Sequence, residues 1–280
     1  NKSSTFLLGI KSRRKVLDKI LLGNISYQIT GLMPFTDKQF ATIGNDWALP
    51  HKILSKKQIA QYKKIATDVG LRLKKAGWKG LFGIDVVVDE KTGRLYLLEI
   101  NARQPASTTY ESALQNNIRI TNSANIRNEL TTFEAHLASL LDVNLKNNEL
   151  IRITDGAQVV QRVTAHIPSL PEPKFSKKPP FDIVKYNNDK QGADLLRMQT
   201  ADNVMKEHNE FNGVGKKMID FVGCVRGGNV WDSQRAGVII IKNNKLLVIE
   251  RNKYGRRYLI LPGGTWEKRD GELSNTAIRE

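Results

Sequence analysis

A pair of adjoining strands constrains the fold of this chain more than any other feature of its sequence. The stretches GLFGIDVVVD and RLYLLEIN are largely apolar, and the turn-like EKTG separates them, which predicts a β-hairpin. In and just after the second strand, Glu99, Asn101 and Arg103 occupy every second position, with apolar or small residues between them. Because successive side chains of a strand point to opposite faces, these three polar groups are expected on one face.

The register of this hairpin follows from the length of its turn. A five-residue turn over 90–94 places Asp89 opposite Leu95, and Asp85 then falls opposite Glu99. Like charges directly opposite one another destabilise a sheet, so such a pair needs a compensating partner. The pairing of two carboxylates therefore predicts a binding site rather than an ordinary solvent-exposed sheet face.

A divalent cation is the partner that fits these groups. Magnesium prefers hard oxygen ligands, uses one or two carboxylates, and takes its other oxygens from phosphates and water. We therefore predict Asp85, Glu99 and the amide oxygen of Asn101 as metal ligands, and Arg103 as a planar donor to phosphate or carboxylate. The alternative is an ordinary polar hairpin face, since any half-buried strand alternates in this way.

Two helices around the hairpin have clear start signals. Ser55 and Gln58 form a capping-box pattern before a helix that runs to about Ala76, and Thr131 repeats the pattern before a second helix with an apolar stripe. His136 lies on that second helix and is interpreted as structural. Another strand, AQVVQRVTAHI, follows.

The segment GLFGIDVVVDEKTGRLYLLEINARQPAST resembles the metal-binding part of ATP-grasp enzymes, which place an acid on one strand and Glu-x-Asn-x-Arg on the next. The agreement extends upstream through the first helix and the strand LLGNISYQITG, and downstream to about Ile167. The resemblance implies an ATP-dependent ligase, in which a carboxylate attacks the γ-phosphate and an amine captures the acylphosphate. Its small-molecule partners would be a carboxylate and an amine.

The resemblance also implies roles for single residues. Asp85, Glu99 and Asn101 would hold Mg²⁺ or Mn²⁺, while Glu99, Asn101 and Arg103 would bind ATP, with Arg103 as the catalytic residue. The family's nucleotide grip, a glycine-rich loop with lysines, precedes its metal strands, whereas no glycine-rich loop occurs here before Gly31. We therefore expect residues 1–167 to be an ATP-grasp-like lobe without its N-terminal nucleotide-binding part.

The carboxyl end resembles the opening of a Nudix hydrolase domain, in which a Gly-Gly loop leads into a helix with metal-binding carboxylates. The spacing departs from the usual motif, and its last acidic pair would lie just beyond the end of the sequence, so we expect the chain to be truncated at both ends. The residues that carry this resemblance are Gly263, Gly264, Glu267, Glu272, Arg279 and Glu280.

These observations predict an α+β fold: an antiparallel sheet with packed helices, followed by the first strands of a Nudix-like α/β sandwich. Residues 168–232 are predicted as a proline-containing linker with an uncertain region, and residues 233–280 as the partial Nudix-like domain. In that domain, two strands around Asn243 and Asn244 are expected to form a hairpin.

Composition narrows the class of protein. A single cysteine, Cys224, excludes an internal disulfide framework and a cysteine-based zinc cluster, and no apolar run approaches the length of a membrane span. With no signal peptide pattern, the prediction is a cytoplasmic protein. The net charge of +16 comes from scattered basic pairs, which we interpret as a solvated surface that attracts phosphorylated ligands, so no nucleic acid partner is expected.

Two alternatives to the ligase remain open. One is a Nudix-type hydrolase of nucleoside diphosphate derivatives whose other lobe binds substrate, and the second is a non-enzymatic basic binding protein. The sequence does not identify the carboxylate, the nucleophile or the oligomeric state.

Overall fold

The computed structural model describes most of the first 224 residues and short strands beyond them. The chain divides into two compact units, Asn1–Val222 and Gly223–Glu280, which are described separately below. The described residues are 2–9, 20–121, 129–145, 148–165, 167, 179–186, 188–224, 235–237, 240–242, 245–253, 256–260 and 262–265.

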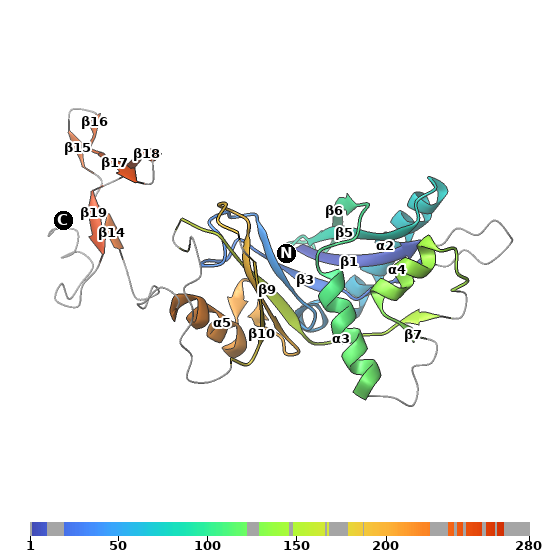
Figure 1. The fold of residues 1–280 in the computed structure, drawn as a ribbon. Coiled ribbons are helices and arrows are strands. Elements are labelled where there is room, and N and C mark those ends of the chain that lie inside the picture. The colour runs from blue at the N-terminus through green and yellow to red at the C-terminus, as the bar shows by residue number, and fades with distance from the viewer. Residues whose placement is uncertain are drawn as a thin grey trace. The chain divides into compact units, whose positions relative to one another are not determined.

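The first unit is built on one antiparallel sheet, which confirms the predicted α+β class. Among the described residues this sheet has nine strands in the order β10-β11-β9-β4-β3-β1-β5-β6, with β2 paired to β1 (Figure 1). The strands are β1 (Lys2–Gly9), β2 (Ile20–Leu22), β3 (Ser26–Thr30), β4 (Thr42–Asp46), β5 (Gly80–Val88), β6 (Leu95–Asn101), β9 (Ala157–Arg162), β10 (Asp182–Lys185) and β11 (Asp194–Thr200).

Helices and short strand pairs complete the unit. A parallel pair joins β7 (Glu129–Leu130) to β8 (Glu149–Leu150), and an antiparallel pair joins β12 (Met205–Glu207) to β13 (Glu210–Phe211). Figure 1 shows α3 and α4 beside each other, in green. The helices are α1 (Leu49–Ile53), α2 (Lys56–Lys75), α3 (Thr108–Thr121), α4 (Thr132–Leu140) and α5 (Gly213–Cys224).

Both predicted capping boxes are present. The Ser55 hydroxyl accepts a hydrogen bond from the Gln58 N–H, and the Gln58 side chain accepts one from the Ser55 N–H at the start of α2. Thr131 and Glu134 make the same pair of bonds at the start of α4. These bonds satisfy N–H groups that the first helical turn leaves without partners, which fixes where each helix begins.

The alternation of β5 separates a helix-covered face from an open face. Phe82, Ile84 and Val86 are buried together with Tyr62 and other residues of α2. The residues between them point to the opposite face, where Leu81 packs with Ala135 of α4. Gly83 and Asp85 continue that second face, beyond the reach of α4, and line a pocket.

The other half of the sheet is held by α5 and by one buried carboxylate. Residues of β3, β4, β9 and β11 form the largest core cluster with Met218, Phe221 and Val222 of α5. On the same side, Asp46 is fully buried and accepts four backbone N–H groups, from Ala48 and Leu49 at the start of α1 and from Val204 and Met205. Burial raises the pKa of Asp46, and these four donors oppose that rise.

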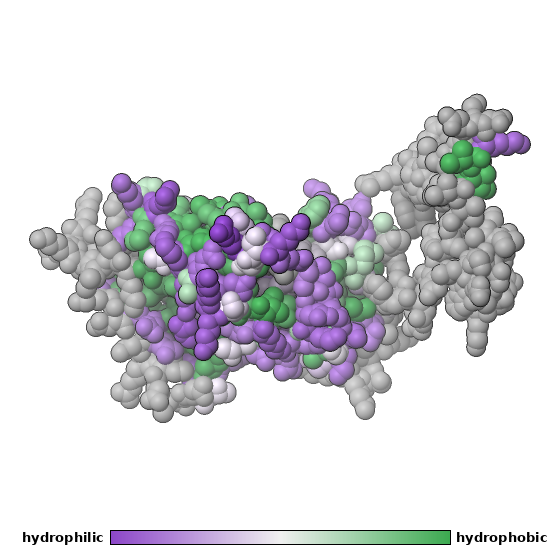
Figure 2. Space-filling view, turned by 180° about the vertical axis from the view of Figure 1, so that it is seen from behind, coloured by the Kyte–Doolittle hydropathy of each residue, from purple (hydrophilic) through white to green (hydrophobic). Residues whose placement is uncertain are grey.

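Helix α4 turns its small residues inward. Thr132, Ala135 and Ser139 are fully buried, whereas Leu137 and Leu141 of the predicted apolar stripe are 43% and 74% exposed. Figure 2 shows hydrophobic side chains of the first unit gathered in places on the molecular surface. His136 lies toward the sheet and its Nδ1 accepts the Leu81 N–H at 3.1 Å, which confirms a structural role.

The stretch for which the sequence predicts a linker and an uncertain region contributes to the first unit. Strands β10 and β11, the β12–β13 pair and α5 all lie between residues 181 and 224, and Phe181, Leu196 and Met205 belong to the core. These strands are short, and the pairing of β11 with β9 contains a bulge. The alternation of apolar and polar residues therefore extends over too few positions to be recognised in the sequence.

In the second unit the structure describes three antiparallel strand pairs. Strands β15 (Ile241–Lys242) and β16 (Lys245–Leu246) pair across residues 243 and 244, which confirms the predicted hairpin. Strand β17 (Ile249–Lys253) pairs with β18 (Arg256–Ile260), and β14 (Arg235–Gly237) pairs with β19 (Gly263–Thr265). Within the described part of the whole chain, no helix has both the length and the apolar character to span a bilayer.

A buried carboxyl anchors α3. Glu111 is fully buried, and its Oε1 accepts hydrogen bonds from the Asn24 backbone, the Asn24 amide and the Thr132 hydroxyl. Its Oε2 has no hydrogen-bond partner among the described residues. Burial outweighs the three donors and raises the pKa of Glu111 to about 7.

This carboxyl predicts a pH-dependent stability. Because the pKa is higher in the folded state, Glu111 favours folding most below its unfolded value, and that contribution is lost as the pH rises to about 7. Glu111→Gln removes the titration, so the unfolding free energy of the variant relative to wild type should increase by ~2 to 3 kcal/mol from about pH 5 to about pH 8. Urea unfolding of wild type and variant at both pH values measures this difference in unfolding free energy. The exposed Glu149→Gln is the matched control, and equal profiles for the two variants would contradict the prediction.

Candidate functional site

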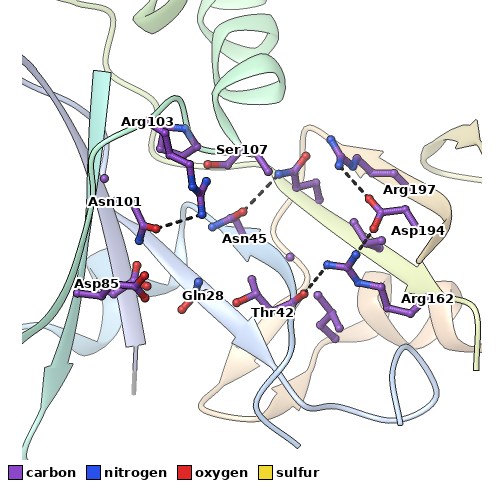
Figure 3. A pocket seen from close by; sticks show the side chains of 18 residues that line it. Gln28, Thr42, Asn45, Asp85, Asn101, Arg103, Ser107, Arg162, Asp194 and Arg197 are labelled. Atoms are coloured by element: carbon purple, nitrogen blue, oxygen red, sulfur yellow. Dashed lines mark hydrogen bonds and ion pairs between the residues drawn. The ribbon is translucent and has the colours of Figure 1, made fainter. Parts of the chain in front are cut away.

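One pocket of about 380 Å³ crosses the open face of the sheet in the first unit. It runs from β5 and β6 at one end, across β3 and β4, to β9 and β11 at the other (Figure 3). The loop after β6 forms its rim. The lining residues with polar side chains are Gln28, Thr42, Asn45, Asp85, Glu99, Asn101, Arg103, Ser107, Gln158, Arg162, Asp194 and Arg197.

The structure brings the four predicted site residues together at the β5–β6 end of this pocket. The strand register confirms that Asp85 lies opposite Glu99, and Gly83 lies opposite Asn101. Gly83 and Asn101 both line the pocket. Arg103 follows two residues after Asn101 and is turned into the pocket in Figure 3.

The turn that sets this register differs from the prediction. The Asp89 N–H donates to the Arg94 carbonyl, so Asp89 faces Arg94 and the turn has one residue fewer than expected. Gly93 adopts a φ of 66°, which permits the shorter turn. A bulge between Asp85 and Val86 then adds one residue to β6 and restores the predicted pairing.

Asn101 and Arg103 interact directly. The Arg103 Nη2 donates to the Asn101 Oδ1 at 3.0 Å, so the amide oxygen predicted as a ligand already accepts one hydrogen bond. An amide oxygen has two lone pairs, and the second remains available to another partner. Glu99 and Arg103 are exposed, whereas Asp85 and Asn101 are half-buried.

The donor set at this end fits a small hard cation that also binds phosphate. Asp85 and Glu99 offer carboxylate oxygens on adjacent strands, and Asn101 offers an amide oxygen. Two carboxylates are the number that Mg²⁺ commonly takes from a protein when phosphates and water complete its shell. The described residues contain no cluster of three or more His, Cys, Asp and Glu side chains that could hold a metal by themselves. For a metal at this end, oxygens from water or phosphate would complete the coordination shell.

Amide side chains that the sequence analysis missed line the middle of the pocket. Gln28 on β3, Asn45 on β4 and Gln158 on β9 lie opposite one another in the strand register. The Gln158 Nε2 donates to the Asn45 Oδ1 at 3.3 Å, and the Asn45 Nδ2 donates to the Ser26 hydroxyl at 3.1 Å. The sequence carries a signal for these amides in β3 only, where Ser26, Gln28 and Thr30 alternate with Tyr27 and Ile29.

A charged cluster at the far end was missed as well. Arg162 and Asp194 are register partners on β9 and β11, and they form an ion pair. Arg197 also contacts Asp194, with 3.5 Å between Nη2 and Oδ2. Arg162 lies within the predicted strand AQVVQRVTAHI and is the last residue of β9, but its partners lie in the region to which the sequence analysis assigned no sheet.

The residues that carry the Nudix-like resemblance are only partly described. Gly263 and Gly264 belong to β19 and pair with Gly237 and Ala236 of β14. The other residues of this motif, Glu267, Glu272, Arg279 and Glu280, lie outside the described residues. A Nudix-like domain therefore stays a prediction.

Comparisons with known proteins give distant likenesses only. No family model and no curated protein matches the chain. Among solved structures, the N5-carboxyaminoimidazole synthetase from Staphylococcus aureus complexed with ADP has 15% identity and a TM-score of 0.49, and the match covers 81% of this chain and 50% of that one.

Two further solved structures match at a similar level. The N5-carboxyaminoimidazole ribonucleotide synthetase from Thermus thermophilus has 12% identity and a TM-score of 0.47, covering 81% of this chain and 52% of that one. The biotin carboxylase domain of 2-oxoglutarate carboxylase from Hydrogenobacter thermophilus, in complex with MgADP, has 9% identity and a TM-score of 0.48, covering 72% and 41%.

The chain thus spans about half the length of the solved synthetases that it matches. At these identities and TM-scores, the likenesses do not establish a function for this chain.

Gly44 on β4 gives a test of how tightly the floor of the pocket is packed. A Cβ at this position would lie 2.0 Å from the Gln158 carbonyl oxygen, so Gly44→Ala has to push β4 away from β9. We expect a loss of ~1–3 kcal/mol in unfolding free energy, measured by urea denaturation. Gly213→Ala is the matched control, because its Cβ would meet no atom within 4 Å. Equal stabilities of the two variants would show that the floor is not close-packed.

Proposed function

We propose that this protein is an ATP- and Mg²⁺-dependent ligase that joins a carboxylate to an amine through an acylphosphate. The observation that carries the proposal is the pairing of Asp85 with Glu99, beside Asn101 and Arg103, at one end of a polar pocket. The same residues carry the resemblance to the metal-binding part of ATP-grasp enzymes. The proposal concerns the complete protein.

Each residue has a distinct part in this proposal. Asp85, Glu99 and Asn101 would hold Mg²⁺ against the phosphates of ATP, where the ion supplies positive charge to the transferring phosphoryl group. Arg103 is the one guanidinium at this end of the pocket among the described residues, and its hydrogen bond to Asn101 keeps it beside the ligands. Its planar donors suit the oxygens of the phosphoryl group and of the acylphosphate.

The reaction needs no nucleophile from the protein. An oxygen of the substrate carboxylate attacks the γ-phosphorus, the bond to the β-phosphate oxygen breaks, and ADP leaves. The amine then attacks the acyl carbon, phosphate leaves, and the nitrogen loses a proton. Such chemistry depends on holding two reactants close together and on neutralising phosphate charge. A pocket lined by amides, acids and guanidinium groups suits those two tasks.

Substituting Glu99 tests the proposal. Glu99→Gln keeps the size of the side chain but removes the charge that would bind the metal, so Mg²⁺-dependent ATP consumption by the complete protein should fall roughly 100-fold. Binding of MgADP, measured by calorimetry, should weaken as well. Glu90→Gln, in the exposed turn of the same hairpin, is the matched control and should leave both quantities unchanged.

The result that would overturn the proposal is equally specific. If Glu99→Gln consumed ATP at the wild-type rate with the same dependence on Mg²⁺, the acid pair would not be a metal site. Loss of activity in Glu90→Gln as well would point to damage of the hairpin rather than of the site.

A further inference from the structure

The far end of the pocket holds charges that the proposed nucleotide site does not use. Arg162, Asp194 and Arg197 line the β9–β11 end, while the acid pair lies on β5 and β6. Between Arg162 on β9 and Asp85 on β5 the sheet order places β4, β3 and β1. Four strand spacings correspond to roughly 20 Å along the sheet. In the strand order these charges therefore lie at the opposite end of the pocket from the acid pair.

Several contacts hold the side chains of Arg162, Asp194 and Arg197 in place. Arg162 is fixed by two contacts, one from Nη1 to Asp194 and one from Nη2 to the Thr42 carbonyl at 3.0 Å. Arg197 is fixed by Asp194 and by the ring of Tyr186, whose centroid lies 5.9 Å from the guanidinium carbon. Asp194 thus holds two guanidinium groups in one place.

The three side chains remain open to the pocket. Arg162 and Asp194 are 27% and 26% exposed, and Arg197 is 16% exposed. Val160 and Arg162 occupy alternate positions of β9 and so point to the same face of the sheet. Arg197 is the register partner of Val160, and Asp194 is the register partner of Arg162, so Arg197 and Asp194 share that face, which lines the pocket. An arginine has five N–H donors, and the bonds described for these two residues use only some of them.

Charge decides what such a cluster can bind. Two guanidinium groups and one carboxylate leave a single positive charge at this end of the pocket. A carboxylate group carries one negative charge and matches the planar donor fork of arginine. A phosphate monoester carries about −1.5 to −2 at neutral pH, which is more than the cluster compensates.

We infer that Arg162 and Arg197 bind a carboxylate on one of the two substrates, distant from the atoms that react, and that Asp194 is the positioning residue that sets this preference over phosphate. The inference rests on the proposed function, which places the reacting atoms at the β5–β6 end. One substrate is thus an elongated molecule that bears a carboxylate at the end remote from the reaction.

Two small probes of similar shape test this inference. Acetate and methyl phosphate differ mainly in the charge and number of their oxygens, and their dissociation constants for the complete protein are measured by ligand-detected NMR. We expect acetate to bind to wild type, and its dissociation constant to rise at least about tenfold in Arg197→Gln. Arg197→Lys keeps the charge but loses the planar fork, and a partial loss is expected. Arg72→Gln on the exposed surface of α2 is the matched control and should bind like wild type.

Asp194→Asn gives the sharper result. Removing its negative charge raises the charge of the cluster to two, so the preference should shift from acetate toward methyl phosphate by about tenfold or more. A protein that merely lost its fold would bind neither probe, and circular dichroism checks for that. Equal acetate binding by wild type and Arg197→Gln, tighter binding of methyl phosphate by wild type, or no shift in Asp194→Asn would each overturn the inference.

Binding of MgADP to the same variants keeps this test separate from the proposed function. If Arg197→Gln and wild type bind MgADP equally but neither binds acetate, the carboxylate site is wrong and the nucleotide site stands. If acetate binding behaves as expected while wild type does not bind MgADP, the proposed function fails and only an isolated carboxylate site remains.

Discussion

The carboxylate of Asp46 accepts backbone N–H groups from the adjacent Ala48 and Leu49 and from Val204 and Met205, which lie 158 and 159 positions further along the sequence than Asp46. Its Oδ1 accepts the N–H groups of Ala48 and Leu49 at the start of α1, and its Oδ2 accepts those of Val204 and Met205 at the start of the β12–β13 pair. Because Asp46 ends β4, these bonds also fix the strand that carries Asn45 into the pocket. This one buried acid thus ties the end of β4, next to the middle of the pocket, to α1 and to the β12–β13 pair.

The sequence predicted the parts of the site that depend on local pattern. Alternation along β5 and β6 identified Asp85, Glu99, Asn101 and Arg103, and capping boxes identified the starts of α2 and α4. The pairing of Asp85 with Glu99 came out correctly although the turn is shorter than expected, since a bulge compensates. The predicted register was thus correct only because a shorter turn and a bulge offset each other, and turn length alone is an insufficient guide to register.

The rest of the pocket could not be predicted because it depends on contacts between distant segments. Asp194 lies in a polar stretch with weak periodicity, and only the pairing of β11 with β9 places it against Arg162. The amides Gln28 and Asn45 meet Gln158 only because β4 pairs with β9, although Asn45 and Gln158 lie 113 positions apart in the sequence. Nor does periodicity reveal that α4 packs through Thr132, Ala135 and Ser139, since the large apolar residues dominate its pattern.

Helix α4 therefore has two different sides, an inner side of small buried residues that pack against the unit and an outer side of large, partly exposed residues. A helix that packs through small side chains lies close to its neighbours, and replacing any of those residues by a larger one would move it. The large residues on its outer side, Phe133, Leu137, Leu140 and Leu141, remain 41% to 74% exposed, so each contributes less to stability than a fully buried side chain would. The inner and outer positions of this one short helix are therefore under separate physical constraints, close packing on one side and partial exposure to water on the other.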